Sequence, residues 1–507
     1  MSHEPESTSV QEAHRSGIDL SYRAPELPAA VRQQLPQPWL PGRADWIALY
    51  WRAWSIAYDK IRRPTPGSGL VPFCDAAFSE HLFQWDTCFM EQFLRFAPPV
   101  FCATGSLDNF YLKQHTDGFI CREISSVTGK DYWSQDHLSA INPPLFADAE
   151  WQLYRVHGEE ARLASVLGPL TRFHDWLRRH RRTADGQAYW TTLLASGMDN
   201  SPRAGTERGR EIDHHHHFHH AWVCITAQQA LAAHRIADMA LILGDDVLAR
   251  RLRDEAEALE DFIRRNMWNA RRGGYSDLGP DGTVSDVLTP AMCWPLLLPD
   301  ASSEHGEEIA QRLEDESTFW RHHAIPSLAA DHALYEPQGN YWRGAVWPPM
   351  VYLTARSMKA IGQYPLAKRI AENHLENLSA VFQDTGTLWE NYAPDAAAPG
   401  DISRPEFVGW TGCGAIALLI DTVLGLEVEA PEGRIHWRLD LQQDHGVDGL
   451  PIAGESVSLK YLSASHSLDV ETSGSLDLHI QRGDVEVVFR SLIGKHRLPL
   501  APHGLPR

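Results

Sequence analysis

From residue 45 to about residue 425, apolar residues recur three or four positions apart in one segment after another, which is the spacing of one face of an α-helix. Leu248, Leu252, Leu259, Phe262 and Ile263 are an example. Loops rich in Gly, Pro and Asn separate the segments. Consecutive helices with short joins favour an all-α assembly, either a solenoid or a closed double ring. The sequence has no repeat of fixed period, which disfavours the solenoid.

The periodic segments predict about twelve helices. The helix that follows Gly244 shows the clearest apolar face. The expected ranges are 45–62, 86–97, 104–114, 146–157, 158–182, 218–243, 246–267, 289–298, 304–314, 345–362, 364–382 and 409–425.

After about residue 430 the apolar residues alternate with polar ones, which is typical of strands with one buried face. The chain is therefore expected to have three parts: an N-terminal arm over 1–40, a helical domain over 41–430 and a small antiparallel β-domain over 431–507. The arm is polar and rich in proline, which predicts a surface location rather than a core element. The expected strands are 435–439, 457–461, 468–470, 476–480 and 485–489.

The charge balance excludes some classes of partner. The 507 residues carry 46 Lys and Arg against 66 Asp and Glu, a formal net charge of −20, so neither nucleic acid nor an anionic membrane is an expected partner. The first residues lack a basic start followed by an apolar core, and no apolar run is long enough to span a bilayer. The seven cysteines are scattered singly, as expected for reduced thiols. We expect a cytoplasmic protein.

Four irregular tracts combine aromatic rings with carboxylates, amides and arginines in predicted loops, where binding residues preferentially sit. Tryptophan, of which the chain has 18, offers a flat face that stacks on sugar rings, although most tryptophans fill cores. The tracts are FQWD at 83–86, SGMDNSPR at 196–203, NYWRGAVWPP at 340–349 and LWENY at 388–392.

Two carboxylates stand out within these tracts. Asp199 lies among residues that break regular structure, so a loop presents it, although taken alone such a residue is more often an Asx-turn or helix-cap aspartate. Glu390 lies between Trp389 and Tyr392, where a carboxylate is a catalyst, a sugar ligand or an ordinary surface residue. Cleavage of a glycoside needs one protonated and one ionised carboxyl group. Arg343 is a secondary candidate for binding a hydroxyl or a carboxylate.

The run of histidines from His214 to His220 resembles a metal trap. It lacks an HExxH motif and an acidic partner cluster, so it is interpreted as a solvated or gate-lining helix start with Asp213 as N-cap.

Taken together and in this order, the four tracts, with FVGW at 407–410, resemble glycoside hydrolase family 63 and its relatives over about residues 80–425. The relatives include processing α-glucosidases and the mannosylglycerate and glucosylglycerate hydrolases. The resemblance implies an (α/α)6 barrel, hydrolysis of an α-glycosidic bond with inversion, and neither a cofactor nor a metal in the chemical step. An inverting pair of carboxylates should stand roughly 6.5–9.5 Å apart.

Carried over position by position, the resemblance makes Asp199 the general acid and Glu390 the general base. Residues 118–124 and 142–144 also look like family segments that border the pocket, although relatives often carry glutamine where Asn142 stands. Phe83, Ala204 and the histidine run depart from the family pattern, which bears on the identity of the substrate. The implied substrate-binding residues are Trp85, Asp86, Asn142, Asn200, Arg203, Tyr341, Trp342, Arg343, Trp347 and Trp389.

The sequence thus predicts an inverting, exo-acting α-glycosidase, foremost an α-glucosidase, whose partner is a small carbohydrate and which could form a homo-oligomer. A glucosylglycerate or mannosylglycerate hydrolase is the close alternative, disfavoured by Asn142. A sugar 2-epimerase on the same barrel would use two histidines as proton carriers. A binding protein without catalysis is the remaining alternative.

Overall fold

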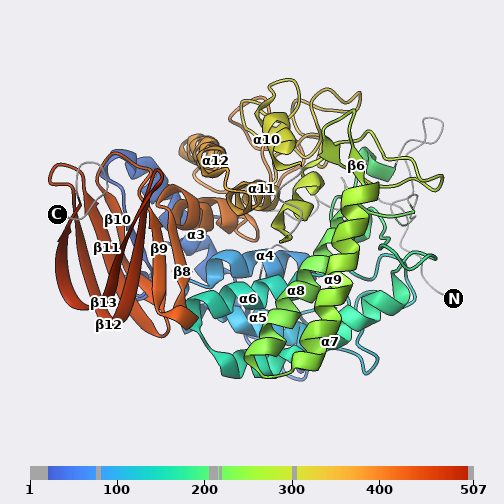
Figure 1. Cartoon of the computed structure of the whole chain (residues 1–507), viewed down its shortest axis with the longest axis horizontal. Helices are drawn as coiled ribbons and strands as arrows, with labels where there is room; N and C mark the ends of the chain where they lie inside the picture. The colour runs from blue at the N-terminus through green and yellow to red at the C-terminus, as the bar shows by residue number, and fades with distance from the viewer. Residues whose placement is uncertain (1–20, 76–80, 205–214, 216–219, 300–304, 501–507) are drawn as a thin grey trace.

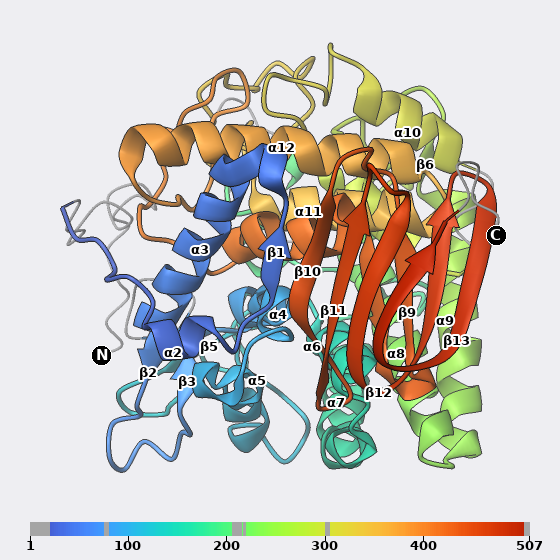
Figure 2. The same ribbon diagram turned by 90° about the vertical axis from the view of Figure 1, so that its left-hand side faces the viewer.

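The computed structural model describes residues 21–75, 81–204, 215, 220–299 and 305–500. A body of helices makes up most of the molecule, and a β-sheet stands at one end of it beside α3 (Figure 1). The same sheet faces the viewer in Figure 2, with α3 and α12 next to it.

Every one of the twelve expected ranges holds a helix. Ten of these are α-helices, whereas η5 is a 3-10 helix and η6 follows the wider π pattern. The apolar periodicity does not predict the short α2. The bounds are α2 Ala29–Arg32, α3 Ala44–Asp59, α4 Gln84–Leu94, α5 Ala103–Leu112, α6 Phe146–His157, α7 Glu160–His180, α8 Val223–Ile242, α9 Asp246–Asn266, η5 Pro290–Leu297, α10 Gly306–Glu314, α11 Pro348–Ala360, α12 Tyr364–Thr385 and η6 Cys413–Val423.

The helices fall into an inner and an outer set. All residues of α4 are buried, and α8 and η6 are buried on nearly every side, whereas α9 buries only one stripe. Contacts run from α4 to α6, α8, η5, α11 and η6 in succession, and η6 contacts α4 again. The outer helices pack on this inner set: α5 on α4, α7 on α6 and α8, α9 on α8, α10 on η5, and α12 with α3 on η6.

The helix after the histidine run begins later than expected, at Val223 rather than residue 218. The backbone of Ala221 bridges Leu278, and the Trp222 N–H donates to the Tyr189 carbonyl, so both residues are extended. The carboxylate of Asp277 accepts a hydrogen bond from the Val223 N–H at 2.8 Å and satisfies the helix start. Asp213, the expected N-cap, lies outside the described residues.

The C-terminal sheet has the strand order β1-β10-β11-β12-β9-β8, with β13 also paired to β12. The expectation of an antiparallel sheet is wrong at one pairing, because β9 and β12 run parallel. Alternation shows which face a residue takes, but it does not show which strand lies beside it. The bounds are β1 Gln37–Trp39, β8 Leu426–Glu429, β9 Arg434–Arg438, β10 His445–Ile452, β11 Glu455–Leu462, β12 Ser467–Arg482 and β13 Val485–Pro499.

The described part of the N-terminal arm is more integrated than its composition predicts. β1 pairs with β10, and Leu35 and Leu40 on either side of it are buried. The apolar residues of the arm therefore complete one edge of the sheet.

The helical body also contains three two-stranded antiparallel sheets. They pair β2 Ile61–Arg62 with β3 Phe73–Cys74, β4 His81–Phe83 with β5 Glu123–Ser125, and β6 Trp268–Asn269 with β7 Gly274–Tyr275.

All seven cysteines are free thiols, as the sequence predicts, and six of them are buried. Every helix among the described residues is too short or too polar to cross a bilayer.

Candidate active site

The four sequence tracts meet at one cavity of about 190 Å³, which is small beside the roughly 300–1,000 Å³ typical of ligand pockets. Eight of the twelve predicted site residues line it, both proposed catalytic carboxylates included. The described lining residues are Phe83, Trp85, Asp86, Arg122, Glu123, Trp133, Asn142, Leu194, Gly197, Asp199, Tyr341, Trp342, Trp347, Glu390 and Trp410.

Tryptophan rings form the walls of this cavity. Trp342 and Trp347 stack in parallel with their ring centroids 4.1 Å apart. The ring centroid of Trp85 lies 5.7 Å from that of Trp342 and 5.8 Å from that of Trp410. Rings held by one another keep their orientation, so the walls offer preformed apolar faces of the kind that stack on a sugar.

Asp199 and Tyr341 lie next to each other in the cavity. The Tyr341 hydroxyl donates to the Asp199 carboxylate at 3.4 Å. Burial, followed by the negative charges of Asp199 and Glu390, raises the pKa of Tyr341 well above its ordinary value. Tyr341 therefore keeps its proton and remains a hydrogen-bond donor at the cavity.

Asp86 stands in the first turn of α4 and is 6% exposed. Burial raises the pKa of its carboxyl well above the ordinary value, and the charge of Glu390 adds to this increase. A carboxyl with such a pKa is poised either to bind a hydroxyl group or to hold a proton.

Glu390 is 1% exposed and is fixed through its backbone. Its N–H donates to the Arg404 carbonyl at 2.9 Å, and its carbonyl accepts from Trp410 Nε1 at 2.8 Å. Burial lowers the pKa of Arg404, and the charge of Glu390 opposes that decrease. The Glu390 carboxylate is thus held at the cavity with a cation nearby.

Three buried donors at the cavity have no hydrogen-bond partner among the described residues: the amide nitrogen of Asn142, the indole nitrogen of Trp85 and Nε of Arg122. A buried donor without a partner costs about 1–3 kcal/mol, so these groups are suited to a ligand that carries acceptors.

Asn200 does not line the cavity, but it shapes the loop that does. Its Oδ1 accepts from the Trp342 N–H at 2.7 Å, and its Nδ2 donates to the Asn340 carbonyl at 3.1 Å. Arg343 Nε in turn donates to the Asn200 carbonyl at 3.2 Å. These contacts tie the GMDNSPR tract to the NYWRG tract.

Gly197 allows Trp85 to reach its place. Its φ is +79°, and a Cβ there would lie 2.5 Å from the Trp85 ring. Only glycine fits both the left-handed backbone and this close approach.

Two other predicted residues also lie outside the cavity lining. Arg203 is buried in a two-bond ion pair with Asp277, at 2.9 and 2.7 Å, and so supports the start of α8. Trp389 donates from its indole nitrogen to Thr385 at 3.1 Å and supports the loop that carries Glu390.

We did not predict a binding role from the sequence for four residues that line the cavity: Trp133, Trp410, Arg122 and Glu123. Trp133 Nε1 donates to Glu123 at 2.8 Å, which joins two of these residues at the cavity wall. Trp410 belongs to the FVGW motif and Arg122 to the segment 118–124, so a signal existed for both. Trp133 lies in a loop with no motif, and the fold alone brings it to the cavity.

The described residues include two histidines of the run, His215 and His220. His215 Nδ1 lies 3.0 Å from Ser139 Oγ, and its ring contacts His137 and Trp133. His220 contacts Asp185 at 3.2 Å. His214, His216, His217 and His219 lie outside the described residues. None of the described residues that line the cavity is a histidine.

The model of the mannosylglycerate hydrolase MGH1-like glycoside hydrolase domain matches residues 80–411, the region that supplies every residue of the cavity. The chain belongs to this family. It is a glycoside hydrolase of the family 63 type, as the four tracts predict.

Two relatives are similar to this chain in sequence. An uncharacterized protein of Borreliella burgdorferi is 22% identical over 80% of this chain and 86% of its own length. A probable mannosyl-oligosaccharide glucosidase of Schizosaccharomyces pombe is 26% identical over 47% of this chain and 31% of its own length. This chain thus spans about a third of the length of the fission yeast relative.

Solved structures share the fold. A family 63 mannosylglycerate hydrolase from Thermus thermophilus, in complex with glucose, aligns with a TM-score of 0.57 and 21% identity over 73% of this chain and 98% of its own. A protein described as a sialidase aligns with a TM-score of 0.69 and 16% identity over 92% of this chain and 43% of its own.

Proposed function

We propose that this glycoside hydrolase is an inverting, exo-acting α-glycosidase that releases one glucose from a short α-linked oligosaccharide or a small glucoside. Asp199 serves as general acid and Glu390 as general base. The single observation that carries the proposal is that both carboxylates line one compact cavity walled by tryptophan rings.

The reaction divides between the two carboxyl groups. Asp199 gives its proton to the glycosidic oxygen as the bond to the anomeric carbon breaks. Glu390 takes a proton from a water molecule, whose oxygen attacks the anomeric carbon from the opposite face. Inversion requires the two carboxyl groups to stand roughly 6.5–9.5 Å apart, so that the water fits between Glu390 and the sugar.

The size of the cavity supports exo action. About 190 Å³ accommodates one bound sugar unit rather than a run of them. The unpartnered donors of Asn142 and Trp85 offer hydrogen bonds to its hydroxyl groups. Asp86 and Tyr341 add an acceptor and a further donor. Asn200, Arg203, Arg343 and Trp389 serve as positioning residues in this proposal.

The scaffold in the proposal is a closed (α/α)6 barrel. The succession of contacts from α4 through α6, α8, η5, α11 and η6 back to α4 supports a closed inner ring, with the outer helices packed around it. The seven free thiols suit the reducing cytoplasm, which is the proposed location.

Arg122 supports a second candidate, a glycosidase for substrates with a small acidic leaving group, such as glucosylglycerate or mannosylglycerate. Arg122 is the one Lys or Arg among the described residues that line the cavity. It is 8% exposed, and its Nη1 donates to the Leu194 carbonyl at 2.7 Å. A guanidinium with further donors in a small cavity is well suited to a carboxylate.

Hydrolysis of kojibiose, nigerose, maltose, isomaltose, glucosylglycerate and mannosylglycerate, followed by proton NMR, tests both candidates. The proposal expects the β-anomer to appear first from an α-linked substrate. First appearance of the α-anomer would mean retention and would overturn the roles of Asp199 and Glu390. A strong preference for the two glycerate substrates would favour the second candidate.

A further inference from the structure

A group of metal-binding side chains lies outside the active-site cavity, on the C-terminal sheet. His436, His479 and Glu486 come from β9, β12 and β13, which lie side by side in the sheet. His436 pairs with His479 in the parallel ladder, and Val488 of β13 also pairs with His479. Glu486, two residues from Val488, therefore projects from the same face of the sheet.

This face is the one opposite the apolar core of the sheet. The neighbours of the two histidines, Ile435, Trp437, Leu478 and Ile480, are buried. The side chains of His436 and His479 therefore point away from the core, and three hydrogen-bonded strands fix their spacing.

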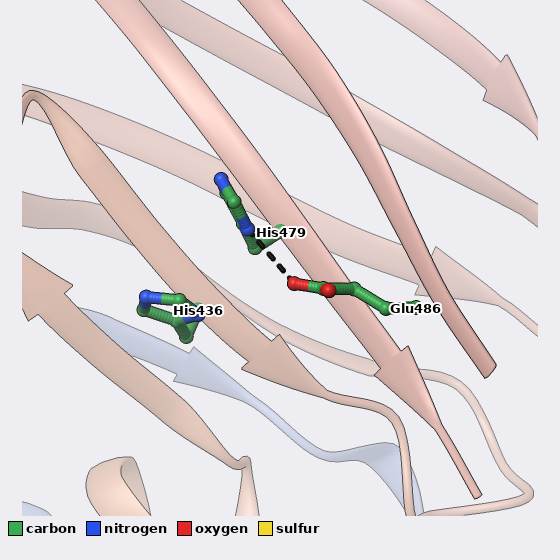
Figure 3. A group of neighbouring side chains, drawn as sticks. All are labelled: His436, His479 and Glu486. Atoms are coloured by element: carbon green, nitrogen blue, oxygen red, sulfur yellow. Dashed lines mark hydrogen bonds and ion pairs between the residues drawn. The ribbon is translucent and has the colours of Figure 1, made fainter. Parts of the chain in front are cut away.

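The donor atoms of the three side chains already converge. One atom from each lies within 4.8 Å of the others. His479 Nδ1 and Glu486 Oε1 are 2.9 Å apart, and the two imidazole rings lie 4.9 Å apart (Figure 3). Ligands about 2.1 Å from a tetrahedral Zn²⁺ ion stand roughly 3.4 Å from one another, so small side-chain rotations complete the site. His436 has no hydrogen bond to any described residue that would oppose such a rotation.

The surroundings leave room for a further ligand. The group borders a cavity of about 280 Å³ between the sheet and the start of α12 at Tyr364. Glu427 of β8 pairs with His436 in the same row, but its carboxylate is bound by Lys359 at 2.6 Å and approached by Arg155 at 3.6 Å. Glu427 thus contributes negative charge beside the site rather than a ligand.

The nearby cations are directed elsewhere. Arg438 pairs with Asp440 at 3.0 Å and lies over the Tyr364 ring. Arg434 pairs with Glu432 at 2.5 Å. Neither guanidinium competes with an ion for the histidines or for Glu486.

We propose that His436, His479 and Glu486 bind one Zn²⁺ ion, with water from the adjoining cavity completing a tetrahedron. Two imidazole nitrogens and a carboxylate form a ligand set that zinc prefers, whereas Ca²⁺ and Mg²⁺ prefer oxygen alone. The ion joins β9, β12 and β13 and stabilises the sheet. This inference does not depend on the proposed catalytic function.

The histidine run at 214–220 is a second group of potential zinc ligands in the sequence, so the test must locate the ion. Crystals of the full chain soaked in ZnCl2 are examined by anomalous scattering at the zinc edge. We expect a peak bonded to His436, His479 and Glu486. Zinc peaks elsewhere together with none at this position would overturn the proposal.

Equilibrium dialysis against Zn²⁺ gives a second, independent measurement. His436→Asn should lower the number of ions bound by one and abolish the rise in Tm that this ion produces. His496→Asn is the matched control and should change neither quantity, because His496 is a partly exposed histidine on β13 whose Nε2 contacts the Ile493 carbonyl. Equal binding by the parent and the His436 variant would contradict the proposal.

Discussion

The side-chain amide of Asn200 holds the backbone on both sides of Tyr341, through the Trp342 N–H at 2.7 Å and the Asn340 carbonyl at 3.1 Å. Asn340 and Tyr341 have φ values of +36° and +62°, a region that costs side-chain-bearing residues about 1–3 kcal/mol each. The amide therefore stabilises a strained loop that brings the Tyr341 hydroxyl to Asp199.

Replacing Asn200 with Ala should release this loop. The Trp342 N–H and the Asn340 carbonyl lose their partner, and Tyr341 moves from Asp199. We expect kcat/KM for the best glucoside to fall about 10²-fold, because a displacement of about 1 Å near the reacting atoms has that effect. Asn266→Ala is the control, since it removes an amide bonded to the Phe262 carbonyl in α9 and should leave activity unchanged. Unchanged activity of the Asn200 variant would contradict the positioning role.

Gly197 and Gly186 form a matched pair for testing the wall formed by Trp85. Both have a left-handed backbone, with φ of +79° and +72°, but only at Gly197 would a Cβ meet another group, the Trp85 ring at 2.5 Å. Gly186→Ala should lower stability by about 1–2 kcal/mol and keep full activity. Gly197→Ala should lower stability further and raise KM, because Trp85 must move. Identical KM values for the two variants would show that Trp85 does not form the sugar site.

The two carboxylates proposed as catalysts, Asp199 and Glu390, should respond differently to the leaving group. Asp199→Asn should lower kcat on maltose by about 10²–10⁴-fold, the usual contribution of a general acid. It should retain much more activity on α-glucosyl fluoride, because fluoride leaves without a proton. Glu390→Gln should lose activity on both substrates, because water still needs a base. Steady-state kinetics on the two substrates measures this, and equal losses for both variants on the fluoride would exclude these roles.

Arg122 should determine the response to a negatively charged leaving group. Arg122→Met should lower kcat/KM for glucosylglycerate about 10-fold or more while changing kcat/KM for maltose little, because a charge-assisted hydrogen bond is worth about 1.5–3 kcal/mol. Arg122→Lys keeps the charge, so its kcat/KM for glucosylglycerate should fall between the values of the parent and of the methionine variant. If the methionine variant affects both substrates equally, Arg122 supports the cavity wall and does not select the leaving group.

Much of the fold follows from the sequence, since the apolar periodicity located every one of the twelve inner and outer helices. Periodicity did not identify the wide π winding of η6, because the apolar residues of Cys413–Val423 are buried on all sides and show no single face. It also missed the strands β1, β8 and β10. The parallel pairing of β9 with β12 was missed as well, because it depends on contacts distant in sequence.

The candidate site was predictable where residues cluster in motifs. The tracts carrying Asp199, Tyr341 and Glu390 meet at the cavity, as the resemblance implies. Motif membership could not separate lining residues from supporting ones: Arg203 lies in the same tract as Asp199, yet it pairs with Asp277. Trp133 was missed because a loop without a motif carries it, and only the folded chain places it at the cavity.

Asp86 should make the stability of the protein depend on pH. In the unfolded chain its carboxyl ionises near the ordinary value of 3.8, whereas burial, reinforced by the charge of Glu390, holds its pKa well above that in the folded state. As the pH rises above 3.8, the unfolded chain releases this proton while the folded protein retains it. The contribution of Asp86 to stability is therefore complete below that pH and is lost as the pH rises through the folded pKa.

Asp86→Asn replaces the carboxyl with a group that stays neutral. The Tm of the variant should equal that of the parent near pH 4 and should exceed it by a growing margin toward pH 8. The variant should also lose glucoside hydrolysis, because it lacks the carboxyl group proposed to bind the sugar. Asp117→Asn is the contrasting variant. Burial acts to raise the pKa of Asp117, but hydrogen bonds from the Phe119 N–H, Gln135 and Trp176 outweigh it and lower that pKa. That variant should be less stable than the parent at neutral pH, with the difference shrinking as the pH falls. A Tm difference for Asp86→Asn that does not grow with pH would mean that Asp86 ionises normally in the folded protein.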